Sequence, residues 1–126
     1  MNQGAKKHGL AKNEIIRRSN EISAIFQNGR FLRGRWFDVA FSKSANRRVA
    51  FAATKRLRTA VARNRIKRRL REAYRLEKES FSTPAQLVLI GHENILAASL
   101  HELRNEMRNL AIKINRTGNE KGAATQ

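Results

Sequence analysis

One stretch of the chain, from Thr54 to Arg75, restricts the possible folds more than any other part of the sequence. It reads TKRLRTAVARNRIKRRLREAYR and contains ten Lys or Arg but only one acid, Glu72. Its apolar residues nevertheless recur at helical spacing. On a helical wheel, those within about 80° of Ile66 are Ala62, Leu70, Ala73, Tyr74 and Leu76. A solvated basic tail has no need of this repeat, so the stretch predicts a helix, roughly Thr59 to Glu79, with one face in a core.

The other side of this predicted helix is almost purely cationic. Opposite Ile66, or near the boundary of its face, lie one amide and seven basic side chains: Asn64, Lys67, Arg68, Arg71, Arg75, Arg63, Arg65 and Arg69. Guanidinium groups match the geometry of phosphate better than ammonium groups do. A face exposed only for solubility carries mixed charges. This face therefore predicts a partner rich in phosphate.

The charge of the whole chain supports the same interpretation. The sequence has 27 basic and 10 acidic residues, a formal net charge of +17. Neutralising phosphates releases counterions, so nucleic acid is the expected partner and binding should weaken steeply with salt. So dense a charge also repels itself, and polyvalent anions are expected to stabilise the fold. A membrane surface is disfavoured, because no amphipathic segment carries exposed Trp or Leu anchors.

Other features of the composition indicate the cellular compartment in which the chain is expected. The chain has no cysteine, which excludes disulfides and thiolate metal sites. Its longest apolar runs, Val49 to Ala53 and Leu87 to Ile90, are far shorter than the roughly 20 residues of a membrane span. No hydrophobic stretch of signal-peptide length follows the basic N-terminus. We expect a cytoplasmic protein without membrane association.

The length suits one small domain. Residues 1–15 and 117–126 are polar or low in periodicity and are predicted to be disordered, which leaves 16–116 as the domain. Ser19 or Asn20 is the predicted cap of a first helix, which presents Ile22, Ile25 and Phe26 on one face and ends at Gly29.

Strands are predicted at three places before the basic helix and one after it. Residues 29–34 form a leading strand, and the next two, 36–42 and 48–54, are joined as a hairpin through the polar turn SKSANR. Alternation puts Phe37, Val39 and Phe41 on one side of the second strand, with Trp36, Asp38 and Ala40 on the other. After Pro84, residues 86–91 read as a buried strand, and Ser99 with Glu102 forms a capping box for a last helix. The fold class is α+β, in the order α-β-β-β-α-β-α.

The sequence offers no catalytic constellation. A metal-dependent protein nuclease needs converging carboxylates, or His with a general base. The chain has a single aspartate, Asp38, and scattered glutamates. The segment His101-Glu102-Leu103-Arg104-Asn105 lacks the second His of a zinc-protease motif. We predict no catalytic residue and no metal site in the protein itself.

The basic helix also carries a family signature. Leu57, Ala60, the run Arg63-Asn64-Arg65-Ile66-Lys67-Arg68, and Leu70-Arg71 occur at a spacing that resembles the signature of the bacterial ribonuclease P protein subunit. Weaker resemblance extends to RRSNEISAIFQNGR and covers roughly residues 16–114. In two places the chain departs from the family: Arg58-Thr59 stands where many members have Gly-Asn, and Ile22 and Ala40 stand where aromatics are common.

The resemblance implies a fold and a function. The fold is a four-stranded sheet with flanking helices and a β-α-β crossover. The function is that of a partner of a catalytic RNA that removes the 5′ leader of precursor tRNA, with hydrolysis carried out by the RNA subunit and its Mg²⁺. The protein would hold the leader in a cleft between the first helix and the sheet.

Two sets of site residues follow from the residues and the resemblance together. The predicted RNA-binding set is Lys55, Arg56, Arg58, Arg63, Asn64, Arg65, Lys67, Arg68, Arg69, Arg71 and Arg75. The predicted leader-binding set is Ile22, Phe26, Trp36, Lys55 and Arg56. Phe26 has a second interpretation, as a core residue. Because stacking is worth about 1 to 3 kcal/mol per base, a cleft with few aromatics relies more on charge.

Two other classes of protein share some of these features. A ribosomal or RNA-chaperone protein would have the charge and the small α+β body, but no need of the signature spacing. A DNA-binding module would insert the basic helix in a groove, where Asn64 alone could read adenine.

Overall fold

The computed structural model describes residues 10–54 and 59–119. Its elements, in chain order, are η1 (Lys12–Glu14), α2 (Ser19–Asn28), β1 (Arg30–Leu32), β2 (Phe37–Lys43), β3 (Arg48–Ala53), α3 (Ala60–Glu77), η2 (Lys78–Ser80), β4 (Ala85–Gly91), η3 (Glu93–Ala97) and α4 (Leu100–Asn119). The predicted α+β class and the order of helices and strands are confirmed.

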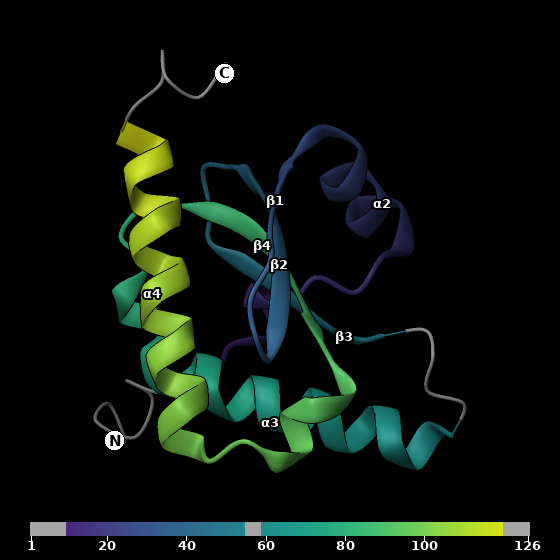
Figure 1. Cartoon of the computed structure of the whole chain (residues 1–126). Helices are drawn as coiled ribbons and strands as arrows, with labels where there is room; N and C mark the ends of the chain where they lie inside the picture. Colours follow the sequence, from purple (N-terminus) through teal and green to yellow (C-terminus); the bar gives the residue numbers. More distant parts are fainter. Residues whose placement is uncertain (1–9, 55–58, 120–126) are drawn as a thin grey trace, which may run out of the picture.

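The four strands form one sheet in the order β1-β2-β4-β3 (Figure 1). The predicted hairpin between β2 and β3 is wrong, because β4 lies between them: it pairs antiparallel with β2 and parallel with β3. Strand β4 is apolar on both faces, with Leu87 and Leu89 on one and Val88 buried on the other. A strand of this kind needs the centre of a sheet. The segment β3-α3-β4 is thus the parallel crossover that the resemblance implied.

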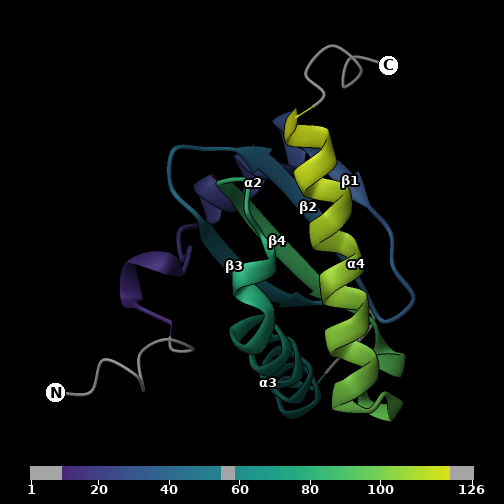
Figure 2. The same cartoon turned by 90° about the vertical axis from the view of Figure 1, so that its left-hand side faces the viewer.

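Helices cover the two faces of the sheet unequally. Figure 2 shows α4 running across one face, with α3 at the lower end of the sheet, and Figure 1 shows α2 on the opposite side. The larger core lies between the sheet and the α3–α4 pair and includes Phe37, Val39, Phe41, Ile66, Leu70, Tyr74, Leu103 and Met107. The smaller core under α2 consists of Ile16, Ile25, Ala40, Ala50 and Val88. Because one short helix covers the second face, part of that face stays open beside it.

Capping residues explain where two of the helices begin. The Thr59 hydroxyl accepts a hydrogen bond from the backbone N–H of Ala62 at 3.2 Å, so Thr59 is the N-cap of α3. Ser99 and Glu102 form the predicted capping box of α4, with reciprocal bonds of 2.9 and 3.1 Å. For α2 the predicted cap is wrong. The helix starts at Ser19, and Arg18 stands at the N-cap position without a side-chain bond.

The first helix ends at a glycine for a packing reason. The backbone N–H of Gly29 donates to the carbonyl of Ile25 at 2.8 Å, and a Cβ at Gly29 would collide with the backbone carbonyls of Phe41 and Ile25. Gly29 thus allows the chain to turn directly from α2 into β1.

The ends of the described chain are more ordered than the sequence predicted. Lys12–Glu14 form η1, and Ile15 makes a parallel bridge with Val49 at the edge of β3. At the other end, α4 continues to Asn119. The remaining residues predicted to be disordered, 1–9 and 120–126, lie outside the described residues. Within the described ranges, no helix has the length and apolar character to cross a membrane.

Candidate nucleic-acid interface

The apolar stripe of α3 fixes which way its charges point. Ile66, Leu70, Ala73 and Tyr74 are buried against the sheet and α4, as the helical wheel predicted. The opposite face therefore points outward and carries five exposed polar or basic side chains: Asn64, Arg65, Lys67, Arg68 and Arg71. Packing of one face thus places the cations of the other in solvent, where they can reach phosphates.

A groove of about 480 Å³ runs between this helix and the open part of the sheet. One wall is formed by four residues of α3: Asn64, Lys67, Arg68 and Arg71. The remainder is lined by Ala50 and Phe51 of β3, Ile22 of α2, and the run from Ile15 to Arg17. The main chain of that run is held at the edge of β3 by the bond from the N–H of Ile16 to the carbonyl of Val49, at 2.8 Å.

The charge in the groove has one sign. Arg17, Lys67, Arg68 and Arg71 line it, and no Asp or Glu of the described chain does. None of these four cations forms an ion pair with a described residue. The apolar surface between them is provided by Ile22, Ala50 and Phe51. Such a groove can hold a phosphate backbone on its basic walls while bases lie on apolar side chains.

Three other basic residues of α3 do not line the groove. The Arg69 guanidinium turns into the junction with α4 and donates to the carbonyl of Ala98. Arg75 pairs with Glu72 at 2.8 Å. Arg63 is half-buried. The predicted RNA-binding residues Lys55, Arg56 and Arg58 lie outside the described residues.

The structure brings only part of the predicted leader-binding set to the groove. Ile22 lines it. Phe26, one turn further along α2, is 49% exposed and is not a core residue. Lys55 and Arg56 lie outside the described ranges.

Trp36 lies apart from the groove. It packs against the core on the α3–α4 side of the sheet, and its backbone N–H donates to Glu106 of α4 at 3.0 Å. Strand alternation predicted the opposite side, but β2 begins only at Phe37, so the alternation does not extend to Trp36.

Sequence reasoning also missed residues of the groove. Phe51 packs edge-on against Tyr74 with ring centroids 6.0 Å apart and also lines the groove, because β3 is an edge strand. Arg17 was not singled out, although it belongs to a basic pair directly before α2. Ala40, where the family often has an aromatic residue, is buried beneath α2.

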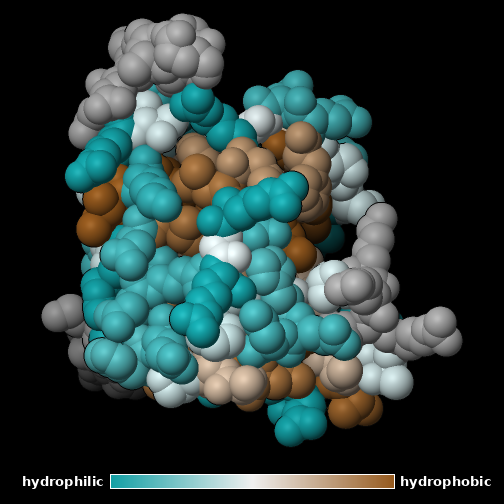
Figure 3. All heavy atoms as spheres, in the orientation of Figure 1, coloured by the Kyte–Doolittle hydropathy of each residue, from teal (hydrophilic) through white to brown (hydrophobic). Residues whose placement is uncertain are grey.

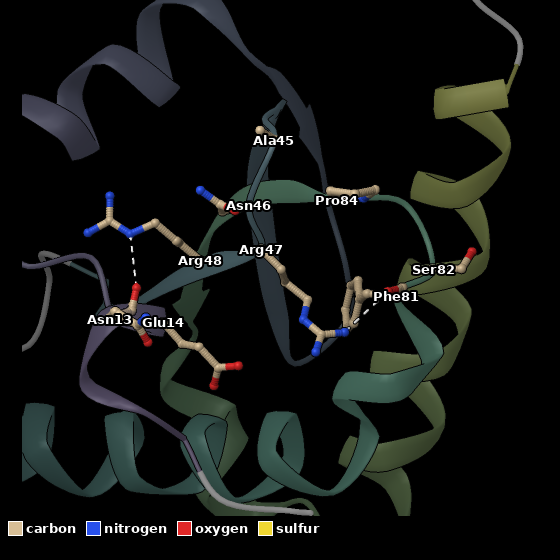
Figure 4. A pocket seen from close by; sticks show the side chains of 9 residues that line it. All are labelled: Asn13, Glu14, Ala45, Asn46, Arg47, Arg48, Phe81, Ser82 and Pro84. Carbon is tan, nitrogen blue, oxygen red and sulfur yellow. Dashed lines mark hydrogen bonds between the residues drawn. The ribbon is translucent and has the colours of Figure 1, made fainter.

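A larger hollow, of about 710 Å³, lies at the start of β3 and is lined by Arg47, Arg48, Glu14 and Phe81, among others (Figure 4). Its guanidinium groups are already used by the fold. Arg47 donates to the carbonyl of Lys78 at 3.0 Å, and Arg48 pairs with Glu21 at 3.2 Å. These bonds connect the start of β3 to η2 and to α2, so the hollow is a weaker candidate for binding phosphate than the groove is.

The acidic and histidine side chains do not gather into a metal-binding cluster. Among the described residues, no group of three or more His, Cys, Asp or Glu is placed to hold a metal ion. His92 and Asp38 form a pair at 3.0 Å, and His101 is exposed beside Asn105.

Comparisons with known proteins agree on one family. The family model described as Ribonuclease P matches residues 10–115. The ribonuclease P protein component of Desulfotalea psychrophila is 30% identical, over 83% of this chain and 89% of the relative. That of Syntrophus aciditrophicus is 32% identical, over 86% and 92%. The solved structure of the RNase P protein from Thermotoga maritima superposes with a TM-score of 0.68 at 25% identity, covering 78% of this chain and 94% of that one.

Proposed function

We propose that this chain, which belongs to the ribonuclease P protein family, is the protein subunit that binds the RNA of that enzyme and the 5′ leader of precursor tRNA. The complex is a tRNA-processing ribonuclease. Within it the protein holds substrate and RNA together, and the leader is removed to give the mature 5′ end.

The observation that carries the proposal is the groove whose charged lining residues are all cations. Four cations line it, with Ile22 and Phe51 between them and no described carboxylate. A leader is single-stranded and therefore offers both phosphates and unstacked bases, which is what a basic groove with an apolar floor accommodates. A duplex would need a broader surface and would leave the apolar floor unused.

The two sides of α3 suggest a division of roles. Lys67, Arg68 and Arg71 line the groove, while Arg65 is exposed on the same helix without lining it. We assign the groove to the leader, together with Phe26, which is exposed one turn along α2 from Ile22, and with Lys55 and Arg56 before α3. We assign Arg65 and the remaining outer face of α3 to the RNA subunit.

Catalysis is assigned to the RNA. Hydrolysis of a phosphodiester by metal ions needs ligands that converge on those ions. The described side chains offer no such group, so we propose that Mg²⁺ is held by the RNA subunit. The site of action would be the cytoplasm, where precursor tRNA is made in bacteria.

Site-directed cross-linking tests the assignment of the groove. The chain has no cysteine, so a single Ile22→Cys variant can carry a photo-activated reagent at one known position. In a complex with bacterial ribonuclease P RNA and precursor tRNA, we expect cross-links from position 22 to the leader. Ile112→Cys is the matched control, because Ile112 is exposed on α4, away from the groove.

The two possible results are distinct. Cross-links from position 22 to the leader and none from position 112 support the proposal. Cross-links from position 22 only to the body of the RNA subunit would contradict the assignment of the leader to the groove.

A further inference from the structure

A second hollow, of about 420 Å³, lies between the β1–β2 loop and α4. We call it the loop–α4 surface and define it by six of its residues, which are Arg33, Arg35, Trp36, Asn105, Asn109 and Lys113. It lies next to β1 and β2, whereas the groove lies at β3. Strands β1 and β3 are the two opposite edges of the sheet. On the face seen in Figure 3, hydrophilic residues extend over α4 and toward this loop.

The main chain of the loop is fixed by hydrogen bonds to three other elements. The N–H of Gly34 donates to Asp38 at 3.1 Å, and that of Trp36 donates to Glu106 at 3.0 Å. The carbonyl of Arg35 accepts a bond from the Asn94 amide at 3.2 Å. Anchors of this kind order the backbone before any partner arrives, so that its side chains are presented at low entropic cost.

The loop presents its two arginines on aromatic rings. The Arg35 guanidinium lies 4.7 Å from the centroid of the Trp36 ring, and that of Arg33 lies 5.9 Å from that of Phe31. Both arginines are exposed, and neither has a carboxylate within ion-pair distance among the described residues. A guanidinium held over a ring keeps its outer side and its N–H groups for a base or a phosphate.

The two carboxylates in the hollow are already engaged. Glu102 accepts the Ser99 N–H of its capping box, and this bond, with a smaller contribution from Arg35, keeps the pKa of Glu102 below its ordinary value. Glu106 accepts the Trp36 N–H. The hydrogen-bonding capacity left at the surface is therefore mainly that of the cations and of Asn105 and Asn109.

We propose that the loop–α4 surface is a second RNA-binding site, which takes the sugar-phosphate backbone of an RNA strand and stacks one unpaired base on the Arg35–Trp36 pair. The proposal rests on the proposed function, because a partner RNA must already be held at α3 and the groove. A body this small, with basic sites at opposite ends of its sheet, would then contact two separate RNA segments at once. The RNA strand could belong to the RNA subunit or to the precursor tRNA.

The fluorescence of Trp36 tests this directly, because it is the only tryptophan of the chain. Acrylamide quenching of the full-length protein is measured alone, with bacterial ribonuclease P RNA, and with that RNA and precursor tRNA. We expect Trp36 to be at least twofold less accessible to acrylamide when RNA is bound. Protection by the RNA subunit alone, or only after tRNA addition, identifies which strand occupies the surface.

Charge-matched variants complete the test. Arg33→Ala with Arg35→Ala should lower the salt slope of RNA binding by about one for each phosphate that the protein no longer neutralises. Lys43→Ala with Arg116→Ala removes the same charge from exposed positions outside both sites and should change the slope less. Both variants leave the anchoring hydrogen bonds of the loop backbone in place.

Each contrary result has a distinct meaning. If the wild type binds RNA and supports cleavage but Trp36 stays equally quenched and both double variants behave alike, the second site is wrong and the proposed function stands. Protection of Trp36 that depends on protein concentration without RNA would overturn the proposal in favour of contact between copies. Failure of the wild type to bind ribonuclease P RNA would instead contradict the proposed function.

Discussion

Single residues show where sequence patterns stop being informative. Helical periodicity correctly placed Ile66 and Leu70 inside and Lys67 and Arg68 outside. It could not place Arg69, which lies at the boundary of the two faces and turns inward because Ala98, 29 positions away, offers a carbonyl. The orientation of a residue at such a boundary is decided by a distant element, and the local sequence does not show which element that is.

Tyr74 gives a prediction at the same scale. It is 1% exposed, packed between Phe51 and Phe81, and burial raises the pKa of its phenol to about 12 from 10.0. Below pH 10 the phenol is protonated in both the folded and the unfolded chain. Between pH 10 and 12 the unfolded chain ionises first, so we expect the free energy of unfolding to fall by about 2 to 3 kcal/mol through this window.

The measurement is straightforward because Tyr74 is the only tyrosine. Ultraviolet absorbance of the phenolate reports the titration of Tyr74. Denaturant unfolding of the wild type and of Tyr74→Phe gives the difference in stability between them. Lysine residues titrate alike in both proteins, so their effect cancels in this difference. A phenol that titrates near pH 10 in the folded protein, or a Phe variant with the same loss of stability at high pH, would contradict the burial argument.

At the scale of elements, helices were easier to predict than strand neighbours. The boundaries of α3 and α4 follow from local chemistry: the Thr59 cap, the Ser99–Glu102 box and a regular apolar repeat. Strands β2 and β3 were correctly located but wrongly paired, because their partner β4 comes some 30 residues later in the chain and only long-range packing selects it. The apolar character of β4 on both faces was the one available signal for its central position.

The charged face of α3 leads to a prediction for RNA binding. Lys67→Ala with Arg71→Ala removes two cations from the groove without touching the buried stripe. We expect weaker binding to precursor tRNA in the complex and a salt slope lower by about one for each phosphate left without its cation. The control is again Lys43→Ala with Arg116→Ala, which removes equal charge elsewhere.

Filter binding across a salt series measures the slope for each protein. If the groove variant and the control variant have the same slope, net charge alone attracts the RNA and the groove makes no specific phosphate contacts.

For the whole molecule, net charge is the dominant property. A charge of +17 on 126 residues repels itself, and the described carboxylates are mostly used in internal pairs such as Glu77 with Arg104 at 2.6 Å and Arg108 at 2.8 Å. Much of the remaining charge lies on α3 and in the groove. Composition alone predicted a nucleic-acid partner, but the position of the groove depended on the open sheet face beside α2, which composition does not reveal.

This charge distribution predicts that folding depends on anions. Sulfate or phosphate that binds only the folded state adds stability in proportion to the logarithm of its concentration, about 2.7 kcal/mol at a hundredfold excess over Kd. We expect the Tm to rise more with sulfate than with chloride at equal ionic strength, and to rise less in the Lys67→Ala, Arg71→Ala variant. Equal effects of the two salts would mean that general screening, and not bound anions, stabilises the fold.

The most direct test of the proposed function is cleavage of a precursor tRNA at physiological magnesium, by a bacterial ribonuclease P RNA alone and then with this protein. We predict correct 5′ processing that becomes efficient only when both are present, and that the groove variant reduces. If the protein binds the RNA but leaves the rate and position of cleavage unchanged, the assignment as a ribonuclease P subunit is contradicted.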